Sequence, residues 1–434
     1  MKGFLNNEKK WLILVLSAIL ALGVFLRVYR AGHQSLWTDE ISSAVISSSP
    51  IHEIISRNLS PDKADIPVEE PPLPYILMHF SMATGGENEF FARLPAIVFG
   101  ILGIYAVFLV ASEFFGKRAG IFSAFLISIS LYHILYSQEA RGYSAHVFWS
   151  MLTLFYLWRA MRGGNGRDWA GFAVATIFNV YSHYSAFQVA AAETLIFLLF
   201  GLIFAGAWGH ARLKERKGPL KNFIICGVAA SIAAAPLLKN FFGVLGSRLG
   251  GGTIAFELNP AYFENLLSRY GAGGGMAFYI YNGFFILGIY SAFKYGKRKE
   301  AAALLIWLIF PFVVLKFTGY KYFFHIRYII FTFPVYLIFA ANGAASLYDI
   351  LASRFSSFFE RRGQYAYGAL LASVFAYFSI APLLLYYQMP ARMTDWKGIA
   401  SYIKAHYRPG PVILAERAFV LRELGYYLRD AKYM

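Results

Sequence analysis

The chain consists largely of apolar blocks of about 20 residues that are separated by short polar stretches. A helix of this length spans the hydrocarbon core of a bilayer, which is roughly 30 Å thick. The blocks run over Trp11–Val28, Leu94–Phe115, Ile121–Leu135, Ala145–Trp158, Trp169–Tyr181, Phe187–Trp208, Phe223–Leu238, Met276–Phe293, Ala301–Leu315, Ile329–Leu347 and Tyr365–Tyr387. The pattern predicts an all-α polytopic membrane protein with a bundle of about eleven transmembrane helices.

Lys and Arg gather in every second loop between these blocks. The basic loops contain Lys117 and Arg118, then Arg162 and Arg167, then Arg212, Lys214, Arg216, Lys217 and Lys221, then Lys294, Lys297, Arg298 and Lys299, then Arg354, Arg361 and Arg362. Because cytoplasmic loops accumulate these residues, the phase predicts a cytoplasmic N-terminus. The segments then expected outside are Ala31–Arg93, Gln138–Tyr143, Ser182–Ser185, Phe241–Gly275, Lys316–Arg327 and the tail Gln388–Met434.

The composition agrees with an integral membrane protein. Of the 434 residues, 58% are hydrophobic and 15% charged, and the mean hydropathy is +0.50. The net charge of +16 would suit nucleic-acid binding, but the alternating basic loops explain it, so we expect no nucleic-acid partner. The one cysteine, Cys226, lies inside an apolar block, which excludes a disulfide framework within the chain and a thiolate metal site.

Two polar regions interrupt the pattern of spans. Residues 31–93 form a long first extracytoplasmic loop, in which the apolar stretch Pro72–Ala83 is too short to cross a membrane and predicts an interfacial helix. The transmembrane domain is expected over residues 1–388, and residues 389–434 are expected to form a short extracytoplasmic α/β segment. That segment is predicted to contain a helix, a strand and a second helix, over Trp396–His406, Pro411–Ala415 and Val420–Arg429.

The motif Trp37-Thr38-Asp39-Glu40 comes shortly after the first apolar block. Two adjacent carboxylates at a membrane surface can supply a general base and a ligand for a divalent cation. The alternative is a helix cap, in which Thr38 or Asp39 begins a short helix. The pattern leaves both open, and Asp39 and Glu40 are the candidate catalytic residues as well as the candidate metal ligands.

Charged and aromatic residues recur at the next two outer turns. Glu69-Glu70-Pro71-Pro72-Leu73-Pro74-Tyr75 precedes the second apolar block, and Arg93 lies where that block begins. The turn Tyr136–Tyr143 places Glu139 and Arg141 between two blocks, where a charge held near membrane depth is a functional candidate. The alternatives are a snorkelling Arg93 and a structural ion pair between Glu139 and Arg141.

Two later outer turns repeat this combination. His183-Tyr184 forms one of them, where a structural histidine is the alternative to a catalytic one. The other combines Lys321, Arg327 and Tyr328 with further aromatic residues. Arginine can clamp phosphate oxygens while rings pack on a lipid chain, although anchoring in the aromatic belt of the membrane explains the same pattern.

The order of these motifs is more informative than any one of them. Along the chain come Trp-x-Asp-Glu, Pro-Pro-Leu-x-Tyr, Ala-Arg-Leu-Pro, Phe-Gly-Lys-Arg-Ala-Gly, Gln-Glu-Ala-Arg-x-Tyr, His-Tyr and Arg-Tyr. In this order they resemble the GT-C superfamily, specifically the dolichyl-phosphate-mannose protein mannosyltransferase-like family, which includes aminoarabinose transferases acting on lipid A. The resemblance covers residues 27–141 well and residues 327–340 more loosely.

The resemblance implies a GT-C-type bundle that transfers a sugar, with inversion, from a polyprenyl-phosphate donor to a protein, lipid or glycan acceptor outside a prokaryotic cell membrane. Asp39 matches the acid that deprotonates the acceptor, with Glu40 beside it, and Arg141 and Arg327 match basic positions near the donor. The candidates for the donor phosphate and lipid are Arg93, Arg141, Tyr143, His183, Tyr184, Lys321, Arg327 and Tyr328. Glu70 and Tyr75 are the candidates on the acceptor side, and many relatives have His where this chain has Glu70. No cofactor is implied with certainty, and a divalent cation remains open.

Two other classes of membrane protein also have many helices and charged residues on the outer side. A transporter or flippase for lipid-linked glycans would place ionisable residues in the middle of spans or interrupt the spans with Gly and Pro. A polysaccharide polymerase would use a large outer loop late in the chain, whereas Phe241–Gly275 is only moderately long. Because most charges lie at the ends of the blocks, the pattern favours an enzyme that works at the membrane surface.

Overall fold

The computed structural model describes residues 2–59, 68–203, 213–250, 258–318, 325–354, 363–408 and 418–428. In these ranges the chain is helical, and extended backbone pairs at one isolated parallel bridge, between Ser35 and Ala391. The all-α class predicted from the hydrophobic pattern is confirmed. The predicted strand Pro411–Ala415 lies outside the described residues, as does Lys321.

Where the structure describes them, the predicted apolar blocks are largely helical. These helices are α1 (Lys2–Val28), α5 (Glu89–Phe115), α6 (Lys117–Ile129) with α7 (Leu131–Ser137), α8 (Tyr143–Met161), α9 (Gly166–Ser182), α10 (Ala186–Ile196) with a π-helical continuation (Phe197–Ile203), α11 (Leu213–Ala234), α14 (Met276–Lys294), α15 (Arg298–Thr318), α16 (Phe333–Arg354) and α17 (Gly363–Gln388). By length and composition, six of the described helical stretches could cross a membrane alone, and α6 with α7 would make a seventh span, bent by 63°.

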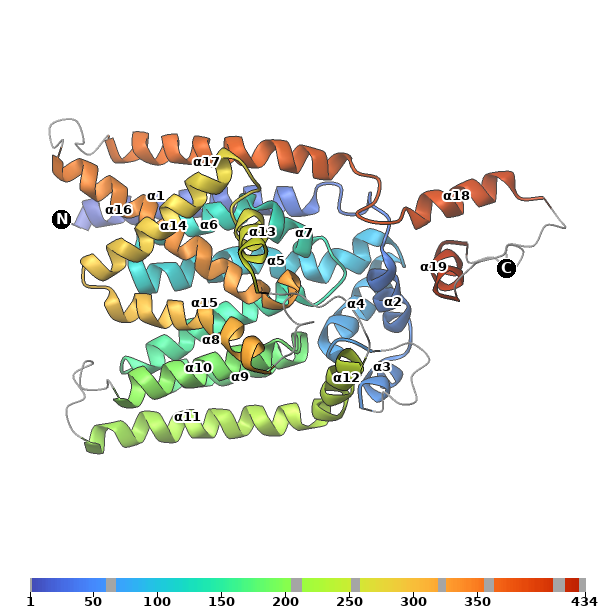
Figure 1. Ribbon diagram of the computed structural model, residues 1–434, viewed down its shortest axis with the longest axis horizontal. Coiled ribbons are helices and arrows are strands. Elements are labelled where there is room, and N and C mark those ends of the chain that lie inside the picture. Colours follow the sequence, from blue (N-terminus) through green and yellow to red (C-terminus); the bar gives the residue numbers. More distant parts are fainter. Residues whose placement is uncertain are drawn as a thin grey trace.

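The remaining helices are shorter. They are α2 (Thr38–Ser47), α3 (Ile51–Leu59), α4 (Pro72–Gly85), α12 (Leu238–Gly250), α13 (Pro260–Tyr270), α18 (Trp396–His406) and α19 (Ala418–Leu428). Figure 1 shows the long helices side by side, with α2, α3, α4 and α12 gathered at one end and α18 and α19 beyond them, whereas α13 lies over the middle of the bundle. The helix α1 begins at the opposite end. The helices of the first predicted outer loop and of the predicted outer tail therefore lie at the same end of the molecule.

The helices α14 and α16 touch through two glycines. A Cβ atom added to Gly288 would lie 1.8 Å from the carbonyl oxygen of Phe339, and one added to Gly343 would lie 2.1 Å from that of Phe284. Small residues let membrane helices approach until their backbones meet, and van der Waals packing then holds them together. Between Phe333 and Ser346, α16 is buried along its whole circumference, so this contact lies at the centre of the bundle.

We expect Gly288→Ala to destabilise the bundle by about 1–3 kcal/mol, because an added methyl group must push the two backbones apart. The measurement is the midpoint of thermal unfolding in detergent. Gly283 lies on the same helix with nothing within 4 Å of an added Cβ, so Gly283→Ala is the matched control and should leave the midpoint unchanged. Equal midpoints for the two variants would contradict the tight contact.

A buried arginine holds the bend between α6 and α7. Arg27, at the end of α1, donates to the carbonyl oxygens of Ile127 and Ser128, each at 3.0 Å. It also contacts His133 Nδ1 at 2.8 Å and Ser137 Oγ at 3.3 Å. These carbonyls have no helical partner at the end of α6, so the guanidinium satisfies them. Arg27 thereby fixes α7 and the turn after it, which carries Glu139 and Arg141.

The C-terminal segment packs on the first extracytoplasmic loop. Its helices contribute Trp396, Ala400, Leu424 and Leu428 to an apolar cluster with residues of α2 and α4. The backbone of Leu36 donates to the Tyr427 hydroxyl at 2.8 Å, and the backbone of Lys397 donates to Ser35 Oγ at 3.1 Å. The segment therefore supports the loop that leads to Asp39.

Candidate active site

Asp39 and Arg327 meet at this end of the bundle, although 288 residues separate them in sequence. Asp39 lies in the first turn of α2, and Arg327 lies in a short 3₁₀ segment, Ile326–Thr332, that leads into α16. An Nη atom of Arg327 is 3.5 Å from an Asp39 carboxylate oxygen. The Asp39 side chain is 27% exposed and the Arg327 side chain is 19% exposed, so a ligand can reach both.

Arg327 is only partly satisfied by its surroundings. Its guanidinium lies over the rings of Trp37 and Tyr328, at 5.6 and 5.5 Å from their centroids. Its Nε atom is buried without a hydrogen-bond partner among the residues that the structure describes. An arginine with a spare donor and a loose ion pair is well suited to receive an anion.

Glu40 points away from Asp39, because neighbouring helical residues differ in direction by about 100°. Its carboxylate accepts two hydrogen bonds from Arg93, both at 2.8 Å, and a third from the backbone of Ala140 at 2.8 Å. Burial opposes its ionisation, but the charge of Arg93 and the hydrogen bonds from Arg93 and Ala140 together outweigh burial, and the pKa of Glu40 is lowered. Glu40 also accepts from the backbone of Trp37 at 3.3 Å, which caps α2.

Arg93 is fully occupied in this arrangement. Besides Glu40, it donates to the carbonyl oxygens of Ala31, Gln34 and Ser35 at 2.8, 2.9 and 3.2 Å. Its side chain is 3% exposed. Arg93 and Glu40 therefore fasten residues 31–40 to α5. Their polar atoms are used in these contacts and not at Asp39.

Arg141 pairs with the first loop rather than with Glu139. Its Nε atom is 2.9 Å from Glu70, an Nη atom is 3.8 Å from Glu69, and the other donates to Ser43 Oγ at 3.2 Å. Burial raises the pKa of Glu70 to about 7, although the charge of Arg141 acts against this. The sequence offered an ion pair between Glu139 and Arg141 as an alternative. In the structure, Arg141 pairs instead with Glu70, which lies much farther away along the chain. Arg141 lies within electrostatic range of Asp39.

An aromatic wall joins these groups. The ring of Tyr143 packs on Tyr136 and on His183, both at 5.1 Å between centroids, and His183 lies 6.2 Å from Tyr328. His183 accepts a hydrogen bond from the backbone of Ser185 at 3.1 Å. Burial lowers the pKa of His183 well below its ordinary value, so the imidazole is neutral at pH 7 and offers no charge to a phosphate.

Tyr184 and Tyr75, two of the predicted site residues, are packed between the outer helices. The Tyr184 hydroxyl accepts from Asn240 at 2.8 Å, which attaches α12 to the turn after α9. Tyr75 is buried in a cluster with Ile46, Ile54 and Val68. Both hold the outer helices in place around the site.

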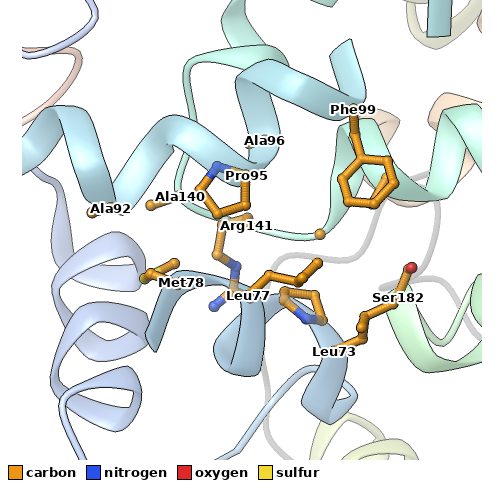
Figure 2. A pocket seen from close by; sticks show the side chains of 13 residues that line it. Leu73, Leu77, Met78, Ala92, Pro95, Ala96, Phe99, Ala140, Arg141 and Ser182 are labelled. Atoms are coloured by element: carbon orange, nitrogen blue, oxygen red, sulfur yellow. The ribbon is translucent and has the colours of Figure 1, made fainter. Parts of the chain in front are cut away.

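A mostly apolar hollow lies beside Arg141. Figure 2 shows Leu77 and Met78 of α4 on one side of it and Pro95 and Phe99 of α5 on the other. Gly142 forms part of its lining, and an added Cβ there would lie 2.2 Å from the carbonyl oxygen of Ser182. Only glycine lets the turn after α7 approach the end of α9 this closely.

Carboxylates and imidazoles do not gather into a metal centre in the described part of the chain, where no three His, Cys, Asp or Glu side chains form such a group. Glu40 uses its oxygens on Arg93 and Ala140. The predicted pair of metal ligands, Asp39 and Glu40, therefore does not share one coordination site in this structure.

Arg392 is the residue of this region that the sequence did not single out. It lies between α17 and α18, and its guanidinium contacts the Glu139 carboxylate and lies 5.4 Å from the Tyr136 ring centroid. No local motif marks it, since its neighbours are ordinary loop residues. Its relation to Glu139 comes only from the fold.

Part of the chain matches the model of a known protein family. The family model described as dolichyl-phosphate-mannose-protein mannosyltransferase matches residues 69–233, a range that includes Arg93, Arg141 and His183. A search of curated proteins found no match.

Solved structures share the fold over almost the whole chain. ArnT from Cupriavidus metallidurans in the apo state is 15% identical, with 98% of this chain and 85% of that chain covered and a TM-score of 0.63. The same protein bound to undecaprenyl phosphate is 16% identical, with coverages of 97% and 85% and a TM-score of 0.58. The Archaeoglobus fulgidus oligosaccharyltransferase AglB, in complex with an inhibitory peptide and a dolichol-phosphate, is 15% identical, with coverages of 93% and 59% and a TM-score of 0.57. The family match over residues 69–233 and the fold shared with these proteins agree with the GT-C resemblance that the order of the motifs predicted.

Proposed function

We propose that the chain transfers a sugar from a polyprenyl-phosphate carrier to an acceptor on the extracytoplasmic side, with inversion and with Asp39 as general base. The observation that carries the proposal is the meeting of Asp39 with Arg327, since it joins a base and a cation at one accessible place. The acceptor is a protein, lipid or glycan, and the sugar is a hexose or pentose.

The reaction needs these two groups on opposite sides of the anomeric carbon. An acceptor oxygen or nitrogen attacks that carbon and loses its proton to the Asp39 carboxylate. The bond from the anomeric carbon to the phosphate oxygen breaks, and its electron pair leaves with the polyprenyl phosphate. Arg327 offsets the charge that develops on this phosphate, which is usually a large contribution to such a rate.

The ligand-free pairing of Asp39 with Arg327 fits this sequence of events. A donor phosphate competes with Asp39 for the Arg327 guanidinium, and its arrival releases the carboxylate to act on the acceptor. The related proteins described as bound to undecaprenyl phosphate and to a dolichol-phosphate support a carrier of this class.

The test uses purified protein in lipid nanodiscs with a panel of radiolabelled polyprenyl-phosphate sugars and an extract of cell-envelope acceptors. We expect label to move from at least one donor to an acceptor, with release of polyprenyl phosphate in equal amount. Intact donors across the whole panel, with folded protein present, would contradict the proposal.

Arg327→Gln is expected to raise the Kd for undecaprenyl phosphate at least about tenfold, because a charge-assisted phosphate contact is lost. Arg327→Lys should lose less, since it keeps the charge but not the planar fork. The control is Arg118→Gln, which removes an exposed ion pair with Asp349 and should leave the Kd unchanged. Binding of Arg327→Gln at the wild-type level would exclude this residue from the phosphate site.

A further inference from the structure

The segment between α17 and α18 is fastened to the loop that carries Asp39. The Ser35 backbone donates to the carbonyl oxygen of Pro390 at 3.2 Å, next to the bridge between Ser35 and Ala391. The Gln34 side chain donates to the carbonyl oxygen of Tyr386 at 2.9 Å. The position of Arg392 is therefore set relative to residues 34–35 by contacts of the residues just before it in the chain.

The Arg392 guanidinium has one closed side and one open side. It contacts the Glu139 carboxylate, whose side chain is only 1% exposed, while Arg392 itself is 25% exposed. Among the residues that the structure describes, the second oxygen of Glu139 is buried without a hydrogen-bond partner. A guanidinium carries five N–H donors in a planar fork, and the contact of Arg392 with Glu139 uses one of its nitrogens.

Arg392 and Arg327 lie at the two ends of one row of rings. Arg392 lies over Tyr136, and Arg327 lies over Tyr328. The rings between them are Tyr143 and His183, with neighbouring centroids 5.1 to 6.2 Å apart along the row. Each arginine is part-exposed and held by one carboxylate, Arg392 by Glu139 and Arg327 by Asp39. Two arginines from distant segments thus border the same row of rings.

We propose that Arg392 binds the phosphate of the lipid carrier together with Arg327, so that the C-terminal segment completes the donor site. This inference rests on the proposed function. A phosphate oxygen accepts from the part of the Arg392 fork that does not contact Glu139, and two guanidinium groups then hold the anion from two directions. Glu139 keeps Arg392 in position, and its negative charge weakens the attraction of Arg392 for the phosphate.

The alternative role is an anchor, in which Arg392 only fastens the C-terminal segment. A second ion pair anchors the same segment, since Lys397 Nζ lies 3.0 Å from Glu89 at the start of α5. Lys397→Gln is therefore the matched control for loss of an anchor. Glu139→Gln separates the two roles, because it removes the negative charge that weakens the attraction for phosphate and keeps the size of the side chain.

The experiment measures the Kd of undecaprenyl phosphate for wild type, Arg392→Gln, Arg392→Lys, Glu139→Gln and Lys397→Gln in nanodiscs. We expect at least tenfold weaker binding for Arg392→Gln, a smaller loss for Arg392→Lys, at least twofold tighter binding for Glu139→Gln, and no change for Lys397→Gln. Thermal unfolding of each variant checks that it is folded, and Arg392→Lys serves as the probe if Arg392→Gln is not.

The possible results separate the two proposals. If wild type fails to bind undecaprenyl phosphate, the proposed function is contradicted and this inference falls with it. If wild type binds and Arg392→Gln binds equally well, only the role of Arg392 is overturned. Equal weakening by Arg392→Gln and Glu139→Gln would show an anchor and would also overturn it.

Discussion

Asp39→Asn is expected to lower the rate of sugar transfer by a factor of about 10²–10⁴, because a positioned general base contributes this much. The amide keeps the shape of the side chain but cannot take the acceptor's proton. Arg327 remains, so the variant should still bind the carrier lipid. The measurement is the single-turnover rate of transfer, together with the Kd for undecaprenyl phosphate.

The control for this substitution is Asp349→Asn. Asp349 also pairs with an arginine, Arg118, but both side chains are more than half exposed and lie at the other end of α16. Its transfer rate should match that of wild type. Near-normal transfer by Asp39→Asn would remove Asp39 from the role of base, and loss of lipid binding would show that its effect is structural.

Glu40→Ala is expected to cost about 3–5 kcal/mol of stability, because it leaves the Arg93 guanidinium buried without its counter-charge. It also removes the acceptor for the backbone N–H groups of Ala140 and Trp37. The measurement is the midpoint of thermal unfolding in detergent. Asp349→Ala breaks an exposed ion pair and should cost no more than about 1 kcal/mol. Equal shifts of the midpoint for the two variants would be inconsistent with a buried pair that fastens the loop.

The ion pair between Glu40 and Arg93 also predicts how the stability of the protein depends on pH. The folded-state pKa of Glu40 lies below its ordinary value of 4.5. Its contribution to stability is therefore fully present above pH 4.5 and is lost as the pH falls through the folded-state value. Acidification from pH 7 to pH 5 should leave the difference between wild type and Glu40→Ala unchanged.

The transmembrane part of the fold could be predicted from sequence because its signal is local. An apolar block of sufficient length becomes a helix in a bilayer, where backbone groups have no other partner. The pattern did not show that one block, Ile121–Leu135, bends at Ser130, because the bend depends on Arg27 from a different helix. The short helix after Pro72 was predicted from its length alone and is present as α4.

The candidate site was predictable in part. The sequence offered a catalytic pair, Asp39 and Glu40, and a helix cap formed by Thr38 or Asp39 as alternatives, and the structure gives the capping contact to Glu40 instead. Glu40 caps α2 and holds Arg93, while Asp39 faces Arg327. The direction of each side chain follows from the helical turn that begins at Thr38, which the motif alone does not fix.

The partners of the buried charges could not be read from sequence. Arg141 has an acid two residues away, yet it pairs with Glu70, and Glu139 pairs with Arg392. Both choices depend on the packing of α4 and of the C-terminal segment against the turn after α7. Sequence neighbours in a tight turn point in different directions, so proximity along the chain is a poor guide to ion pairs.

The most direct test of the site is photolabelling with a polyprenyl phosphate that carries a diazirine in its first isoprene unit. Mass spectrometry of the labelled protein then identifies the segments beside the phosphate. We expect label in peptides that contain residues 36–43, 136–143 and 325–332, with competition by unmodified carrier. Competable label confined to other segments, such as α11, would contradict a shared site at Asp39 and Arg327.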